Sequence, residues 1–515
     1  TEDKIKTMNL TETEKRDLLN QKRYVGEILK EQYKEKAKGY QVRSRAKWIA
    51  EGERSTRYFL KLEKRHQTFN RIDSLETKNG IKIFNSNQIL MEAHTFYSDL
   101  YASSKPKHDD IEKYLKSLNI GKKLSHEEKQ ICEGKISKEE CKYAVENLKK
   151  NKSPGWDGLP PEFYQQFWED IQDLILDSFN ESFREGELSD TQKLSVLSLI
   201  FKKGNRDKLE NYRPISLSNY DYKILAFVLA ERLQKVVKSI ISEDQTGYIR
   251  KRYIGNNLRE VTDLIEYAEK IEIGGVILFL DFQKAFDSIE WEFLFESLKF
   301  YNFGDEFIRW IRTLYTEPVA VIKNNGWLSE KINLQRGIRQ GCPVSALLFI
   351  IAVEILADSI RTDPKFRGIT IKHKNKIKEF KINQFADDAN LFLFGPEYIK
   401  PTLDILSDYK SVSGLGLNFG KTEALGIGLH KNTQFDTHGL RRAKTPIRSL
   451  GMFVGHQKED CFRLNWENKL EKFQRTLDQW RTRDLTYFGK VQIVKSLAVS
   501  QLTYLFTNDI VPKEV

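Results

Sequence analysis

Cysteine is scarce in this sequence, with four residues among 515. They show neither the short paired spacing of a zinc site nor the density of a disulfide framework: Cys132, Cys141, Cys342 and Cys461. We therefore expect a protein of a reducing compartment.

Long apolar runs are also missing. No run reaches the roughly 18 residues that are needed to span a bilayer, and no signal peptide opens the chain. We therefore expect no membrane partner. The first residue is Thr1 rather than Met, which suggests an excised segment.

Positive charge is what the sequence has in excess. Its 84 lysines and arginines outnumber 73 acidic residues, which gives a net charge of +11 and an isoelectric point near 9.1. This excess favours a polyanionic partner, nucleic acid before membrane, although a merely basic soluble protein has the same charge. The length is too great for one hydrophobic core and suggests three or four packed units.

Two adjacent acids, Asp387 and Asp388, stand between apolar runs in residues 382–394. The alternation predicts strand, tight turn, strand, with the acids at the hairpin tip. Paired carboxylates repel each other, and a divalent cation such as Mg²⁺ removes that cost. A solvated turn is the simpler interpretation of an isolated acidic pair.

A second acidic stretch changes that balance. Residues 276–280 are apolar and lead directly into Asp281, as in a buried strand whose end emerges at a sheet edge. A carboxylate there, facing an acidic hairpin, makes a two-metal site for in-line phosphoryl displacement. Between the two acidic stretches lie a glycine-containing basic loop, residues 336–343, and an apolar helix predicted over 344–356.

This order of acidic strand, glycine loop with helix, and acidic hairpin resembles the palm of reverse transcriptases. The motifs are most similar to those of LINE-type, non-LTR retrotransposon enzymes. The resemblance implies an α+β fold of the right-hand polymerase type. It divides the chain into a helical basic N-terminal extension (1–104), a linker and helical region before the fingers (105–193), fingers (194–275), palm (276–460) and the start of a helical thumb (461–515).

The resemblance also implies roles for single residues. The metal ligands are Asp281, Asp387, Asp388 and the carbonyl of Phe282, holding two Mg²⁺ ions with Mn²⁺ as a possible substitute. Lys421 is a general acid or electrostatic helper near the departing pyrophosphate. The triphosphate is held by Lys202 and Arg213, the sugar meets Phe286, and Gln340 and Gly341 line the nucleotide pocket. Contacts with template and primer fall to Arg250, Lys251, Arg252, Leu450 and Gly451. Asp287 has no assigned role; an ion pair or a helix cap is its simplest interpretation.

Local patterns predict further elements. Asn79-Gly80 predicts a hairpin, followed by a helix over 86–103 and a polar linker over 105–110. Ser137 and Glu140 predict a capping box at a helix start. Other predictions are a strand over 194–201 and helices over 222–238, 255–270 and 490–505. Residues 1–66 read as helical and basic with interleaved aromatics, which suits RNA contact as well as an amphipathic helix that packs its aromatics inward.

The expected function is that of an RNA-directed DNA polymerase of a transposable element. The resemblance implies an RNA template, a DNA primer or target, deoxynucleoside triphosphates and a ribonucleoprotein of cytoplasm and nucleus. Two alternatives stay open: a catalytically silent nucleic-acid-binding relic, and a reverse transcriptase of the group II intron maturase type.

Overall fold

The computed structural model describes Glu27 and residues 71–511, except 120, 375, 482 and 484. The predicted helical segment over residues 1–66 lies outside the described residues, apart from Glu27. The described part is a mixed α+β structure, as predicted, with two five-stranded sheets and many helices. Among the described helices, none has the length and apolar character needed to cross a membrane.

The first described elements match the prediction for this part of the chain. The hairpin strands are β1 (Leu75–Glu76) and β2 (Lys82–Ile83), and helix α4 (Ser86–Tyr101) follows. Asn85 caps this helix because its side chain accepts hydrogen bonds from the amides of Asn87 and Gln88. The predicted polar linker over 105–110 is wrong in its second half. Helix α5 already begins at His108. Asp109 and Asp110 lie in its first turn, where acidic side chains interact favourably with the helix dipole.

Short helices connect this region to the first sheet: α5 (His108–Ser117), α6 (His126–Cys132), α7 (Lys138–Glu146), α8 (Pro161–Gln166), α9 (Trp168–Glu185) and α10 (Asp190–Lys193). The predicted capping box is present at the start of α7, where the Ser137 side chain accepts from the Glu140 amide. The Glu140 side chain in turn accepts from the Ser137 amide, so the box is reciprocal.

The first sheet contains β3 (Leu194–Phe201), β4 (Tyr212–Ser218), β6 (Val319–Asn324), β7 (Trp327–Leu328) and β8 (Ile332–Asn333). β3 is antiparallel to β4 and parallel to β6. Its bounds are those predicted from the apolar run. Residues of β1 and α4 share a hydrophobic core with this sheet, which includes Leu75, Tyr97, Leu197 and Ile322.

The second sheet carries the acidic motifs and is called here the acidic sheet. Its strands are β5 (Gly274–Leu280), β11 (Ile382–Phe385), β12 (Asp388–Leu393), β13 (Glu423–Gly428) and β14 (Arg441–Arg442), in the order β11-β12-β5-β13-β14. β5 lies between β12 and β13 and is antiparallel to both.

Alternate residues of β5 point into two different cores, as the two-residue period of a strand requires. Val276, Leu278 and Leu280 belong to the larger core, with helices α11 (Tyr220–Ile240), α14 (Trp291–Phe300), α16 (Ser345–Thr362) and α17 (Ile399–Ser413). Ile277 lies in a core on the opposite face, beneath α12 (Gly255–Lys270). Helices α11, α12 and α16 occupy the segments predicted for them. This burial on both faces fixes the sheet between two helical layers.

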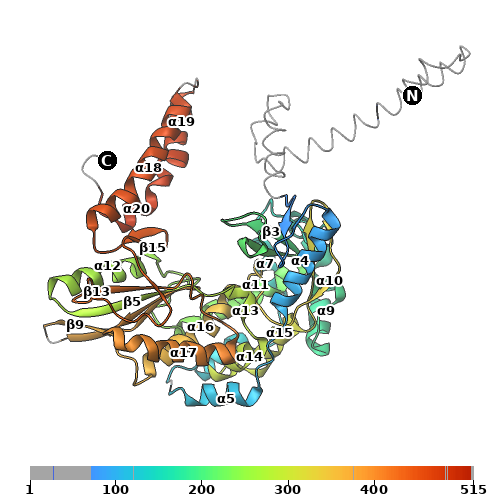
Figure 1. The fold of residues 1–515 in the computed structure, drawn as a ribbon. Helices are drawn as coiled ribbons and strands as arrows, with labels where there is room; N and C mark the ends of the chain where they lie inside the picture. The colour runs from blue at the N-terminus through green and yellow to red at the C-terminus, as the bar shows by residue number, and fades with distance from the viewer. Residues whose placement is uncertain are drawn as a thin grey trace, which may run out of the picture.

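The C-terminal elements rise as a separate arm above the acidic sheet (Figure 1). After the hairpin β15 (Ile447–Ser449) and β16 (Met452–Val454) come α18 (Lys458–Arg481), α19 (Tyr487–Ile493) and α20 (Thr503–Asn508). The single helix predicted over 490–505 is wrong: a π turn at Val494–Ala498 and a 3₁₀ turn at Val499–Gln501 interrupt it. Hydroxyls of Ser500 and Thr503 bond to carbonyls four residues earlier, a competition that disturbs helical geometry.

Candidate active site

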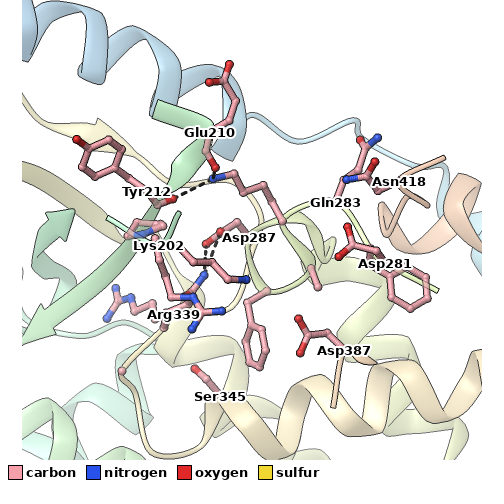
Figure 2. Close-up of a pocket in the computed structure, with 18 of the residues that line it drawn as sticks. Lys202, Glu210, Tyr212, Asp281, Gln283, Asp287, Arg339, Ser345, Asp387 and Asn418 are labelled. Atoms are coloured by element: carbon pink, nitrogen blue, oxygen red, sulfur yellow. Dashed lines mark hydrogen bonds between the residues drawn. The ribbon is translucent and has the colours of Figure 1, made fainter. Parts of the chain in front are cut away.

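Three carboxylates meet at one edge of the acidic sheet. Asp281 directly follows β5, Asp387 lies in the turn between β11 and β12, and Asp388 is the first residue of β12. Leu280 pairs with Ala389 across the two strands, so Asp281 and Asp388 are the next residues in that register. Figure 2 shows Asp281 and Asp387 beside each other at one end of a cavity. The structure therefore brings together residues that lie 106 positions apart (387 − 281).

The turn that carries Asp387 is held from outside the hairpin. Ala386 has a left-handed backbone, with φ of 57°, which an L-residue adopts at a cost. Its amide donates to Gln245 Oε1 at 3.0 Å, and the amide of Gly247 donates to the same oxygen at 2.8 Å. Gln245 is fully buried, and its backbone bridges Gln384 in the strand before the turn. One glutamine side chain thus fixes the backbone next to a predicted metal ligand.

The acids perturb one another. Loss of hydration raises the pKa of Asp388 to about 6; the charges of Asp387 and Asp281 add to this rise, and Lys202 opposes it. By surface area Asp388 is an exposed residue, so we give more weight to repulsion between the carboxylates than to burial. Three hard oxygen donors that repel each other fit a divalent cation, which would relieve the repulsion. The carbonyl of Phe282 is also available, because no hydrogen bond to it is made by a described residue.

Lys421 approaches the same acids. Its Nζ lies 3.9 Å from Asp281 Oδ2, and its side chain is largely exposed to the cavity. The loop before it is tied to the acidic strand, since the Asn418 amide donates to the Asp281 carbonyl at 2.7 Å. The lysine is therefore placed where a leaving anion near Asp281 would meet it.

The cavity beside the acids has a volume of about 600 Å³ and a mixed charge. Lys202 and Arg213 line it from the ends of β3 and β4, and Figure 2 shows Lys202 across the cavity from the acids. Neither side chain makes an ion pair or hydrogen bond with any described residue. An ion-pair role for Arg213 within the described fold therefore has no support. Two free cations that share a cavity with carboxylates suit an anionic ligand.

Phe286 lines the cavity and also packs inside the protein. Its ring stacks on Phe349 of α16, with centroids 4.3 Å apart and an interplanar angle of 15°. Tyr248 meets it edge-on at 6.4 Å. The ring is thus partly a core residue, and its remaining surface faces the space where a ligand would lie.

Gln340 and Gly341 form the far wall of the cavity. Gly341 has φ of 110°, and a Cβ there would lie 2.9 Å from the Ser216 carbonyl oxygen. A side chain at this position would therefore collide with the backbone of β4, which favours glycine. The Gln340 carbonyl accepts from the Ser216 amide at 2.8 Å, which joins this loop to β4.

The residues predicted to touch template or primer lie away from this cavity. The Arg250 guanidinium pairs with Glu231, and Lys251 is exposed. Arg252 donates to three backbone carbonyls, those of Ile241, Ser242 and Gln245, so its guanidinium serves the fold. Leu450 and Gly451 form the turn of the β15–β16 hairpin, where the Leu450 carbonyl accepts from Tyr504 of α20.

Several residues of the site escaped the sequence interpretation. Lys284 Nζ donates to the carbonyls of Glu210 and Tyr212, each at 3.0 Å, and ties the acidic-strand loop to β4. Asp287 is 2% exposed and accepts hydrogen bonds from Tyr101 and Gln340. Because these contacts join segments far apart in the sequence, no local pattern indicates them.

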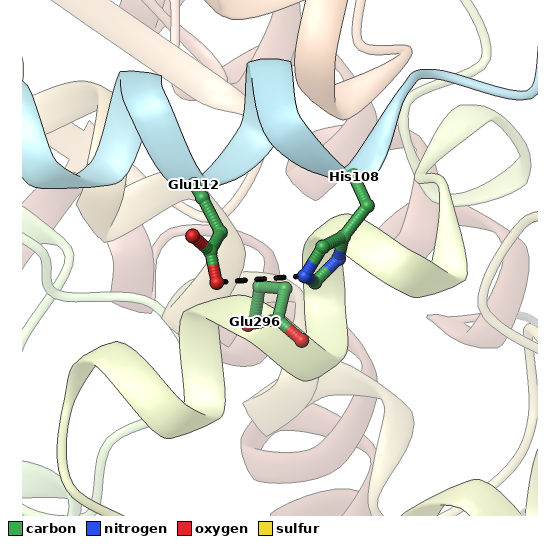
Figure 3. A group of neighbouring side chains, drawn as sticks. All are labelled: His108, Glu112 and Glu296. Carbon is green, nitrogen blue, oxygen red and sulfur yellow. Dashed lines mark ion pairs between the residues drawn. The ribbon is translucent and has the colours of Figure 1, made fainter.

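A second group of possible metal ligands lies outside this site, at His108, Glu112 and Glu296 (Figure 3). Both glutamates already have cations: Lys116 lies 2.5 Å from Glu112, and Lys299 lies 2.6 Å from Glu296. Added positive charge would be repelled there. We therefore interpret the group as an ion-pair cluster between α5 and α14.

Comparison with known proteins decides the family. Residues 200–454 match the family model described as reverse transcriptase (RNA-dependent DNA polymerase), and this segment contains all three carboxylates. The chain contains a reverse transcriptase domain. Its relatives further identify this reverse transcriptase as one of the non-LTR retrotransposon type.

The relatives are proteins of transposable elements. A 149 kDa protein of transposon TX1 from Xenopus laevis is 28% identical over 483 residues, which is 93% of this chain and 36% of that protein. The Pol polyprotein of element R2DM from Drosophila melanogaster is 28% identical over 277 residues, 53% of this chain and 25% of the relative. An R2 polyprotein from Popillia japonica is 24% identical over 299 residues, 57% of this chain and 39% of the relative. The reverse transcriptase thus spans between 25% and 39% of the length of these relatives.

Proposed function

We propose that this chain is the polymerase segment of a non-LTR retrotransposon protein, which copies the element's RNA into DNA from a nicked target-DNA primer. The observation that carries the proposal is that Asp281 and Asp387 line one cavity together with the unpaired cations Lys202 and Arg213, and that Asp388 follows Asp387 at the start of β12. Acids on one side and free cations on the other suit a metal-bound triphosphate.

The metal in this proposal is Mg²⁺, as two ions held by Asp281, Asp387, Asp388 and the Phe282 carbonyl. Bound there, Mg²⁺ supplies Lewis-acid activation of a primer hydroxyl and neutralises charge on the triphosphate. All the donors are oxygens, which is the set that Mg²⁺ prefers, and Mn²⁺ tolerates the same ligands.

The residues around the acids divide the remaining work. Lys202 and Arg213 bind the triphosphate oxygens of a deoxynucleotide. Lys421 is positioned to give a proton to the departing pyrophosphate or to neutralise it. In this proposal the sugar lies against the exposed part of the Phe286 ring, where a 2′-hydroxyl would collide with the ring, so the product is DNA. Gln340 completes the pocket from the loop before α16.

The polymer partners follow from the same proposal. Arg250 and Lys251 of the fingers contact the RNA template, and the turn at Leu450 and Gly451 supports the primer strand beneath the thumb. Such a reaction extends a chromosomal DNA 3′ end along an element RNA, so we propose that the protein acts as a ribonucleoprotein in cytoplasm and nucleus.

Primer extension tests this function. The purified chain is given oligo(dT) annealed to poly(rA), dTTP, and either Mg²⁺ or a chelator. We expect extension with Mg²⁺ and none with the chelator. Binding of the duplex without any extension, in Mg²⁺ or Mn²⁺, would identify a silent nucleic-acid-binding relic and contradict the proposal.

A further inference from the structure

Asp287 is a buried carboxylate that the proposed reaction does not use. It is 2% exposed and forms part of the wall of the nucleotide cavity. Tyr101 Oη lies 3.0 Å from its Oδ1, and Gln340 Nε2 lies 3.2 Å and 3.1 Å from its two oxygens. Tyr101 comes from the last turn of α4, 186 positions earlier in the chain.

The direction of these hydrogen bonds follows from the chemistry of the groups. Burial raises the pKa of Asp287 to about 6, and its bonds with Tyr101 and Gln340 oppose the rise, so at neutral pH the group is mainly an acceptor-only carboxylate. Both partners must therefore donate. Burial also raises the pKa of Tyr101, which keeps its hydroxyl protonated. With its amide nitrogen turned to Asp287, Gln340 directs Oε1 elsewhere, and this oxygen has no partner among the described residues.

Tyr101 is itself firmly placed. Its side chain is nearly buried, its carbonyl accepts from the Gln335 amide at 3.1 Å, and its ring stacks on Tyr97. Tyr101 thus holds Asp287 through Oδ1, and Gln340 Nε2 donates to both Oδ1 and Oδ2 of the same carboxylate. The carboxamide is thus held in one of its two orientations, which differ in whether an acceptor or a donor faces a ligand.

We propose that Tyr101 and Asp287 are positioning residues that hold the Gln340 carboxamide with its oxygen toward the sugar of the incoming nucleotide. This inference rests on the proposed function, because it concerns the nucleotide of that reaction. The Gln340 oxygen, held as an acceptor, favours binding of a nucleotide whose sugar carries a 3′-hydroxyl donor. A 2′,3′-dideoxynucleotide cannot make that hydrogen bond. A segment before the fingers thereby sets a property of the nucleotide pocket.

The test is the ratio of kcat/KM for dTTP to that for dideoxy-TTP, on poly(rA)/oligo(dT). In Asp287→Asn, an amide NH₂ donor replaces one of the two oxygens that accept from Gln340 Nε2, so Gln340 loses its fixed orientation. Tyr101→Phe keeps the ring and removes only the hydroxyl, which makes it the variant most certain to fold. We expect both changes to lower the ratio, by about two- to tenfold for the loss of one neutral hydrogen bond.

Glu290→Gln is the matched control. Glu290 is as buried as Asp287 and accepts bonds from Ser103 and Ser104, but it makes no contact with Gln340. A general loosening of the region behind α4 would lower both kcat/KM values together and leave the ratio unchanged, as we expect for this control. In a Gln340→Ala background, Asp287→Asn should have no further effect on the ratio.

The outcomes separate the two proposals. An unchanged ratio in both Asp287→Asn and Tyr101→Phe overturns this inference while the polymerase function stands. A further fall of the ratio when Asp287→Asn is added to Gln340→Ala also overturns it, because the effect then bypasses Gln340. Failure of the unsubstituted chain to extend any primer overturns the proposed function, and this inference with it.

Discussion

Replacing Gln245 with alanine should loosen the turn that carries Asp387. The Gln245 Oε1 atom accepts from the amides of Ala386 and Gly247, and the side chain is fully buried. Alanine leaves both amides in place without an acceptor.

The size of the effect follows from these two bonds. A buried donor left without a partner costs about 1–3 kcal/mol, so the two amides together cost about 2–6 kcal/mol. Part of that cost acts on the turn itself. The bond to Gln245 holds Ala386 at a strained φ of 57°, which the residue would leave without this bond. We expect kcat to fall by about tenfold or more, since each loss of about 1.4 kcal/mol in holding the turn in place lowers the rate about tenfold.

Hydrogen exchange reads this turn directly. In Gln245→Ala, a peptide covering residues 384–390 should exchange faster at the Ala386 amide, and primer extension at saturating nucleotide should slow. Gln234→Ala is the control, since Gln234 donates a similar side-chain bond to the backbone at Tyr248 but does not touch the turn. Unchanged protection at Ala386 together with unchanged kcat would refute the reasoning.

Three further predictions concern the cavity and its wall. Arg213→Ala should raise the KM for dTTP, because it removes a charge-assisted contact worth about 1.5–3 kcal/mol. Steady-state kinetics with unchanged KM and kcat would return Arg213 to a structural role. Phe286→Val should admit ribonucleotides, seen as a higher kcat/KM for UTP relative to dTTP, whereas Phe349→Leu should lower the melting temperature through the lost ring stack without changing sugar preference. A folded Phe286→Val variant with the original preference would end the gate assignment. In the folded protein the pKa of Asp287 is about 6, above its value in the unfolded chain. The folded state therefore loses stability as the pH rises from about 4 to 6, because the unfolded chain ionises this group more readily. Relative to the unsubstituted chain, Asp287→Asn should therefore gain about 2–3 kcal/mol of stability between pH 4 and pH 8 in denaturant melts; a pH-independent difference would contradict this.

The sequence predicts best the elements whose own hydrophobic periodicity shows which residues are buried. The two faces of β5 are apolar as expected for a strand between two layers, and the apolar run from Leu194 to Phe201 has the bounds of β3. Asp281 and Asp387 could be identified because each ends or interrupts such a run. Family resemblance supplied the roles of Lys202, Arg213 and Phe286, which local chemistry alone does not distinguish from surface or core positions.

What the sequence does not reveal is contact between distant segments. Gln245 lies shortly before the predicted template contacts at Arg250 to Arg252, yet its side chain supports the turn that carries Asp387. Arg252 carries the same charge as Arg250 and Lys251, yet its guanidinium donates hydrogen bonds to three backbone carbonyls. Helical periodicity likewise predicted one helix over 490–505, because the interruption comes from hydroxyl groups that compete for backbone carbonyls.

The central claim is that the three clustered carboxylates hold catalytic metal, and one comparison tests it most directly. Asp387→Asn and, as a control, Asp408→Asn are assayed for Mg²⁺-dependent extension of oligo(dT) on poly(rA) and for binding of the same duplex. Asp408 is an exposed carboxylate on α17, so its loss should change neither property. Asp387→Asn should abolish extension and bind the duplex at least as well, because a negative charge near phosphates is removed. Extension by Asp387→Asn at the rate of the unsubstituted chain would contradict the account.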